Sequence, residues 1–187
     1  MPLHGDEEAL ALLRRRDSRG FDLAYARYAD RLFGFLLRLS RSRAVAEDLF
    51  QHAFLRLSEV GPSLRPDSDL RAWLFSVARN AFHSQARAAR VAERAEPALL
   101  PPPSAAGWGP ESSLAMSELE RALLGLNPND RELLLLIGVE GFGYAEVAEM
   151  LRLDPSAVRK RVSRARDRLA QALDAAAPFV SKSEARR

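Results

Sequence analysis

The chain contains no cysteine. This absence excludes disulfide bonds, thiol chemistry and most structural zinc sites, and it suits a reducing cytoplasm. No segment stays apolar for the roughly 20 residues that a transmembrane helix needs, so we expect no membrane insertion. The N-terminal segment is acidic before it is basic, which does not match a secretory signal peptide. The sequence therefore predicts a cytoplasmic protein without disulfides.

The usual patterns of an enzyme active site are missing as well. The sequence has no glycine-rich phosphate loop and no set of nucleophile and base. Its three histidines, His4, His52 and His83, have no partners at the spacing of metal ligands. We interpret the acidic run at residues 6–8 as a solvated, charged terminus. The prediction is a protein that is not an enzyme and needs no cofactor.

Lysine is almost absent, because only Lys160 and Lys182 occur in the whole chain. Nearly all positive charge is therefore arginine, which forks onto phosphate and stacks on bases better than lysine does. Codon bias in a GC-rich genome accounts for much of the arginine total. It does not explain where the arginines cluster, and that clustering is the first positive indication of function.

Helical periodicity runs through most of the chain, and no segment alternates as a strand would. We expect helices at residues 6–16, 20–39, 42–58, 69–94, 113–125 and 127–141, with two more within residues 142–169. Ser42 and Asn127 are the expected N-caps of two of them, and Gly141 ends the helix that Asn127 begins. The sequence predicts an all-α fold.

A composition change divides the chain. Residues 97–110 hold five of the eleven prolines and two glycines, and no helix survives such a run. We predict an extended linker at residues 95–112. It would join a first helical domain, residues 1–94, to a second, residues 113–176, which a tail at residues 177–187 follows.

The strongest functional pattern is a basic helix that begins at Asp154-Pro155, a good helix start. One face carries the reading residues Arg159, Lys160, Ser163 and Arg164, and the opposite face carries Val158, Val162 and Ala165. Arg161, Arg166 and Arg168 flank the reading residues, where they would meet phosphates. Alone, a basic helix is more often a solvated face with ion pairs. The short helix and tight turn before it favour a DNA-binding helix-turn-helix.

The first half is less distinctive by itself. Residues 46–57 form an ordinary amphipathic pattern, and the arginines of residues 69–94 suit either a second nucleic-acid surface or a solvated face. Trp73 lies between Leu70, Leu74 and Val77, so we expect it in the core.

Three segments together match a known pattern: AEDLFQHAFLRL (46–57), LRAWLFSVARNAFHSQAR (70–87), and the region from Leu124 to Leu169 with its Arg-Ala-Arg. Their order and the linker between them agree too. The chain resembles bacterial sigma factors of the extracytoplasmic function (ECF) type, which are promoter-specificity subunits of RNA polymerase.

The resemblance implies partners and roles. The partners would be core RNA polymerase, promoter DNA and an anti-sigma factor, and the linker would pass through polymerase channels. Polymerase binding would fall to Glu47, Asp48, Gln51 and His52. Capture of the −10 element would fall to Leu64, Arg65, Asp67, Ser68 and Asn80. Reading of the −35 element would fall to Arg159, Lys160, Arg161, Ser163 and Arg164.

One alternative is a stand-alone helix-turn-helix regulator whose first domain senses a ligand or dimerises. Such a protein would bind duplex DNA as a dimer without polymerase. The first half argues against it, because that half lacks a pocket signature and matches a polymerase-binding pattern.

Overall fold

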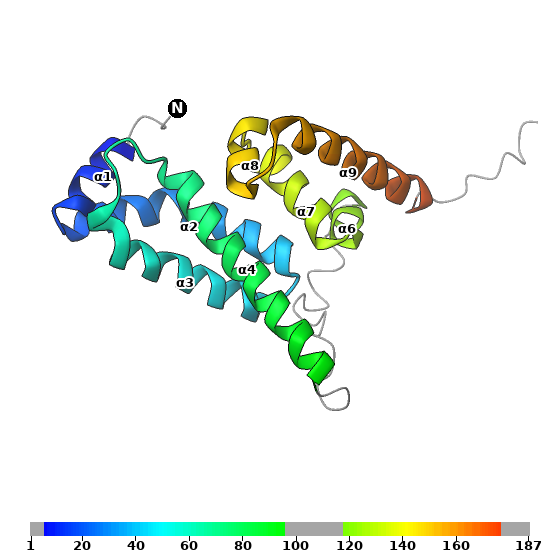
Figure 1. Ribbon diagram of the computed structural model, residues 1–187, viewed down its shortest axis with the longest axis horizontal. Helices are drawn as coiled ribbons and strands as arrows, with labels where there is room; N and C mark the ends of the chain where they lie inside the picture. Colours follow the sequence, from blue (N-terminus) through cyan, green and yellow to red (C-terminus); the bar gives the residue numbers. More distant parts are fainter. Residues whose placement is uncertain (1–5, 96–117, 177–187) are drawn as a thin grey trace, which may run out of the picture. The chain divides into compact units, whose positions relative to one another are not determined.

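The structure is a computed structural model that describes residues 6–95 and 118–176, and every regular element in those ranges is a helix (Figure 1). The all-α prediction is confirmed for this part of the chain. The protein divides into two compact units, residues 1–109 and 110–187. The predicted tail lies outside the described residues, as does the predicted linker apart from residue 95. Their boundaries stay predictions.

Unit 1 contains α1 (Asp6–Arg14), α2 (Ser18–Ser40), α3 (Arg43–Val60), the short 3₁₀ turn η1 (Gly61–Ser63) and α4 (Leu70–Ala95). Helix α2 packs against α1, α3 and α4 and so carries the centre of the core. Phe35 of α2 meets Phe75 of α4 with ring centroids 5.1 Å apart. The C-terminal part of α4 extends beyond the other helices of the unit (Figure 1), which explains the exposed side chains near its end.

Local capping sets the helix starts in unit 1. The Ser42 hydroxyl accepts from the Val45 N–H at 3.4 Å, which confirms the predicted cap of α3. The Asp17 carboxylate accepts from the Arg19 N–H at 3.0 Å, so α2 begins at Ser18, two residues before the predicted start. Helix α3 runs to Val60, two residues beyond the predicted end.

Two predictions about unit 1 are wrong. Asp6 is not a solvated terminal charge, because its side chain is buried and accepts hydrogen bonds from the Tyr28 hydroxyl and from Arg27. This contact joins α1 to α2. Burial, followed by the hydrogen bond to Asp6, raises the pKa of Tyr28 well above its ordinary value. Trp73 is only part-buried, whereas the neighbouring Leu74 is in the core.

Unit 2 contains α6 (Glu118–Gly125), α7 (Pro128–Leu134), the π turn η2 (Leu135–Val139), α8 (Tyr144–Leu151) and α9 (Pro155–Ala176). Helix α9 packs against α6, α7 and α8. The Asn127 side chain accepts from the Asp130 N–H at 3.0 Å, as predicted for the cap of α7.

The π turn departs from the predicted continuous helix at residues 127–141. The Glu140 N–H donates to the Leu135 carbonyl five residues back at 2.8 Å, one residue further than in an α-helix. The wider turn leaves Val139 exposed while Glu140 stays buried. Gly141 then adopts a left-handed conformation with φ 73° and ends the segment, as predicted.

A buried arginine holds the end of α6. Arg131 of α7 is 3% exposed, and its guanidinium donates to the carbonyl oxygens of Leu123, Leu124 and Leu126 at 3.3, 2.8 and 2.6 Å. The last carbonyls of a helix have no partner within the helix. Arg131 supplies these donors, so α6 and α7 are joined by a charged group inside the unit.

Candidate functional site

Helices α8 and α9 form a helix-turn-helix with a turn of three residues between Leu151 and Pro155. The Glu146 carboxylate accepts from the Gly143 N–H at 2.6 Å and fixes the start of α8. At the start of α9, the Asp154 carboxylate accepts from the Ser156 N–H at 2.7 Å, which confirms the predicted cap. Hydrogen bonds from the hydroxyl and the N–H of Ser156 lower the pKa of Asp154 below its ordinary value.

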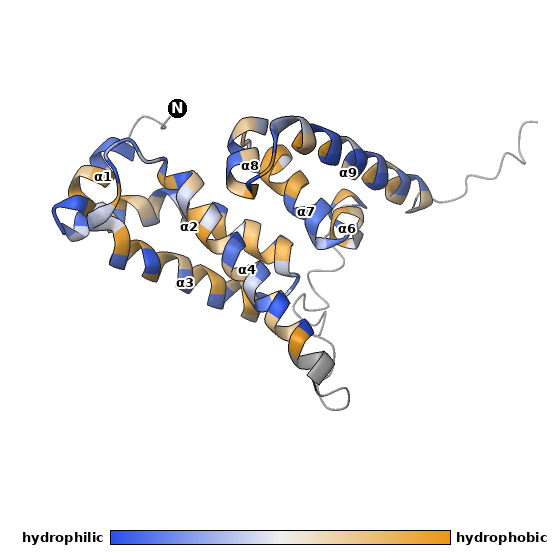
Figure 2. Ribbon diagram, in the orientation of Figure 1, coloured by the Kyte–Doolittle hydropathy of each residue, from blue (hydrophilic) through white to orange (hydrophobic). Residues whose placement is uncertain are grey.

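Helix α9 has one buried face and one basic face. Val158, Val162 and Ala165 are completely buried, as the spacing predicts. The basic face, which consists of Arg159, Lys160, Arg161, Ser163, Arg164 and Arg166, is exposed. Within the described residues none of these five cations forms an ion pair. Hydrophilic residues accordingly dominate α9 in the hydropathy view (Figure 2). The alternative interpretation of α9, a solvated basic helix whose arginines form ion pairs with neighbours, therefore does not agree with the structure.

Arg168 is the exception among the basic residues of α9. Its guanidinium forms an ion pair with Asp130, whose side chain is only 10% exposed. Asp130 also accepts from the Asn127 side-chain amide at 2.6 Å. Arg168 therefore links α9 to the start of α7, and its phosphate contact stays a prediction. That link fixes the helix that carries the reading residues.

This arrangement suits duplex DNA. One α-helix fits the major groove, and arginine side chains can fork onto guanine edges there. The reading residues lie on the side of α9 opposite Val158, Val162 and Ala165, so they can enter a groove without disturbing the packing of the unit.

The residues predicted to bind polymerase share one face of α3. Asp48, Gln51 and His52 are exposed, while Glu47 is partly occupied by an ion pair with Arg43 at 2.8 Å. An exposed apolar side chain lies at the end of this face, and the sequence analysis missed it. Leu55 is 60% exposed and lies one turn after Gln51. The signal was present in the sequence, since a leucine at this spacing falls on the polar side of α3.

The residues predicted to capture the −10 element do not form one cluster. Arg65 and Asp67 form an exposed, two-pronged ion pair, with bonds of 3.0 and 2.7 Å. Leu64 is buried, so its side chain anchors the loop in the core of unit 1. Asn80 is exposed on α4, ten residues after the helix starts at Leu70.

That separation along the helix amounts to about 15 Å. The Asn80 amide oxygen accepts from Arg79 at 2.8 Å, so it is already engaged. Ser68 is part-buried, and its N–H donates to the Arg65 carbonyl at 3.1 Å, which closes the loop. Asn80 therefore lies almost three turns along α4 from the end of the loop.

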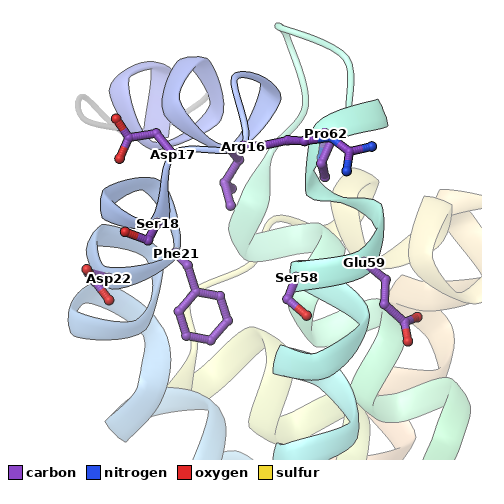
Figure 3. Close-up of a pocket in the computed structure, with 9 residues that line it drawn as sticks. Arg16, Asp17, Ser18, Phe21, Asp22, Ser58, Glu59 and Pro62 are labelled. Atoms are coloured by element: carbon purple, nitrogen blue, oxygen red, sulfur yellow. The ribbon is translucent and has the colours of Figure 1, made fainter.

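A cavity of about 520 Å³ lies apart from all these residues, where the α1–α2 turn approaches the end of α3. Figure 3 shows Phe21 and Ser58 among the side chains that line it. Two of its three carboxylates, those of Asp17 and Glu59, form ion pairs with Arg19 and Arg56 respectively, and the third belongs to Asp22. None of the predicted site residues lines this cavity.

Residues 6–95 and 118–176 hold no group of three histidine, cysteine, aspartate or glutamate side chains that could bind a metal ion. No helix in these ranges combines the length and the hydropathy of a membrane span.

Comparison with known families matches both units. Residues 24–91 match the pattern described as Sigma-70 region 2, and residues 116–169 match Sigma-70, region 4. The second match contains α8 and α9 as far as residue 169, and the first contains α3 and most of α4.

Individual relatives agree. The chain is 34% identical over 157 residues to the RNA polymerase sigma factor CarQ of Myxococcus xanthus, covering 82% of this chain and 88% of that protein. It is 33% identical over 142 residues to the ECF RNA polymerase sigma factor EcfG of Rhodopseudomonas palustris, covering 76% and 78%.

Among solved structures, the chain resembles the sigma factor RpoE of Bartonella quintana in complex with the anti-sigma factor NepR. The TM-score is 0.70 at 30% identity, over 82% of this chain and 96% of the other. CnrH in complex with the cytosolic domain of CnrY gives a TM-score of 0.68 at 25% identity, over 91% and 97%. These matches span both units and favour a promoter-specificity subunit over a stand-alone regulator. The chain belongs to the ECF family of RNA polymerase sigma factors.

Proposed function

We propose that the protein binds core RNA polymerase, directs it to promoters with −10 and −35 elements and helps to separate the DNA strands through binding energy alone. It would act in the cytoplasm, beside the polymerase, and would have no enzymatic activity of its own. The observation that carries the proposal is the basic face of α9, which is exposed in a helix-turn-helix and forms no ion pair with any other described residue.

Unit 2 would read the −35 element. Arg159, Lys160, Ser163 and Arg164 would contact base edges, and Arg161 and Arg166 would contact phosphates on either side. Arginine can fork onto guanine and serine can donate to a base or a phosphate. Arg168 would act indirectly, because its ion pair with Asp130 holds α9 against α7.

Unit 1 would bind the polymerase through α3. Asp48, Gln51 and His52 would supply the polar contacts, with Glu47 at the edge. Leu55 would supply an apolar contact at the end of this face, since an exposed leucine loses water-accessible area when a partner covers it. Protein interfaces commonly combine apolar and polar side chains in this way.

The −10 element would meet unit 1 at two places. Arg65, Asp67 and Ser68 would form the polar edge of the loop, supported by Leu64, and Asn80 would contact a different nucleotide. An unpaired base needs polar partners for its edge and an apolar surface for its ring. The Arg65–Asp67 ion pair is exposed on both sides and is therefore weak enough to open when DNA binds.

An anti-sigma factor would be a further partner. Both solved structures named above are complexes with a second protein. The partner of RpoE, NepR, is an anti-sigma factor. By occupying α3 or α9, such a partner would block polymerase or DNA.

One experiment with two arms tests the division of labour. In the first, Arg159→Ala with Arg164→Ala should lower promoter-specific transcription by about 30-fold or more, since each forked contact contributes about 1–3 kcal/mol, while polymerase binding stays unchanged. In the second, Asp48→Ala with Gln51→Ala should weaken binding to core polymerase. Arg121→Ala, an exposed arginine on α6, is the control.

Promoters would be chosen by transcription of a genomic fragment library with core polymerase. Transcription that is independent of the −35 sequence in the wild type, or retained in the first double variant, would contradict the assignment of α9. An unchanged polymerase-binding curve in the second arm would contradict the assignment of α3.

A further inference from the structure

Three residues other than glycine adopt the left-handed backbone conformation within the described ranges, and all three are arginines. Arg16 has φ 58°, Arg41 has φ 60° and Arg152 has φ 53°. This conformation brings Cβ close to the following carbonyl oxygen, so side chains other than those of glycine, asparagine and aspartate rarely occupy it. Strain of this kind, once observed, motivates a search for function.

The hydrogen bonds that end α8 require a left-handed backbone at Arg152. Its N–H donates to the Glu149 carbonyl at 3.1 Å, and the Leu153 N–H donates to the Ala148 carbonyl at 2.9 Å. This pair of bonds is the common helix-ending motif in which glycine or asparagine serves best. A positive charge near the end of α8 favours the helix dipole, but the left-handed backbone suits glycine or asparagine better than arginine, and the Arg152 side chain is exposed.

The guanidinium of Arg152 has no ion pair within the described residues. Asp154 is only two residues away, but its carboxylate is held by Ser156 at the start of α9. A free cation therefore lies in the turn of the helix-turn-helix, directly before the helix with the reading residues. Arg16 and Arg41 have the same backbone strain but lie in unit 1, at the ends of α1 and α2.

We propose that Arg152 binds a phosphate of the DNA backbone at the edge of the groove that α9 enters. The inference rests on the proposed function of α9. In helix-turn-helix proteins the second helix lies in the major groove while the first crosses the backbone, so the turn between them lies near phosphates. A phosphate contact adds affinity and salt dependence but carries no sequence information.

The test separates this role from a merely tolerated cap residue. Arg152→Asn keeps a residue suited to the left-handed conformation and removes the charge, so the melting temperature should stay the same or rise. Holoenzyme that contains this variant should bind about 3- to 10-fold more weakly at about 0.1 M KCl, equally on all promoter sequences. Its slope of log Kd against log salt should fall by about 1.

The probe is a promoter duplex selected from a random-sequence pool by the wild-type holoenzyme. Arg152→Lys keeps the charge and should keep the salt slope. Arg16→Asn and Arg41→Asn are the matched controls, because they relieve the same strain outside α8 and α9 and should leave affinity and slope unchanged.

Wild-type affinity and salt slope in Arg152→Asn would overturn the proposal, as would a loss of affinity that merely follows a lower melting temperature. If the double variant of Arg159 and Arg164 loses promoter binding while Arg152→Asn does not, only this proposal fails. If both bind normally, the proposed function of α9 fails with it.

Discussion

Replacement of the buried Arg131 by methionine should unfold unit 2 while unit 1 remains folded. Arg131 is 3% exposed and donates to three carbonyl oxygens at the end of α6. Methionine fills a similar length but has no donor. The variant therefore leaves those carbonyls inside the unit without their partner.

The magnitude follows from these contacts. Each buried acceptor left unsatisfied costs about 1–3 kcal/mol, although water that reaches some of them reduces the sum. Removing the guanidinium also removes the cost of burying a charge, so the net loss should be about 3–5 kcal/mol. At about 0.05–0.15 kcal/mol per residue, a unit of this size is stable by only about 3–9 kcal/mol. The loss is thus comparable with the whole stability of unit 2.

Hydrogen exchange of the full chain, read by mass spectrometry, would measure this directly. Peptides from α6 to α9 should lose most of their protection in Arg131→Met, whereas peptides from α1 to α4 should exchange as in the wild type. Arg121→Met makes the same chemical change at an exposed position of α6 and should alter protection by less than about 0.5 kcal/mol. Wild-type protection of α7 and α9 in Arg131→Met would refute the reasoning.

Two more predictions concern unit 1. A Cβ on Gly20 would lie 2.5 Å from the backbone nitrogen of Leu13. In urea unfolding, Gly20→Ala should therefore lower the stability of the α1–α2 contact by about 1–3 kcal/mol. The control, Gly34→Ala on the same helix, should be neutral or stabilising. If the two variants unfold at the same urea concentration, the close approach is not limiting. The raised pKa of Tyr28 means that the folded chain holds this proton more tightly than the unfolded chain, so stability should be fully present below about pH 10 and fall above it. Tyr28→Phe should remove that part of the alkaline loss and Tyr25→Phe, at an exposed position, should not; equal alkaline profiles in both variants would count against the assignment.

The parts of the fold that could be predicted are those that depend on short stretches of sequence. The caps at Ser42, Asn127 and Asp154 each bond an N–H two or three residues ahead, so the signal is local. The two faces of α9 follow from the spacing of Val158 and Val162 in the same way. Both kinds of information survive in any window of about a dozen residues.

The parts that could not be predicted depend on partners far along the chain. Asp6 is bound by a tyrosine 22 residues away, and Arg168 is bound by an aspartate 38 residues away. No spacing rule connects such pairs, because only the folded unit brings them together. For the same reason a solvated terminus was the wrong interpretation of Asp6, and no pattern in the sequence indicated the ion pair of Arg168.

These long-range pairs decide which charges remain available for function. Three acidic residues of unit 2 are less than a tenth exposed: Asp130, Glu132 and Glu140. Their negative charges therefore lie inside the unit and not on its surface. The cations of α9 are exposed and, Arg168 excepted, have no ion pair in the described part of the chain. A formal net charge of only +3 therefore understates the positive field at the surface of α9. If one of these buried acids lay on the outer side of α9 instead, DNA binding would weaken although the composition would be the same. The net charge of the chain is therefore a poor guide to nucleic-acid binding. The distribution of charge in the folded unit identifies one helix, α9, as the DNA-binding surface.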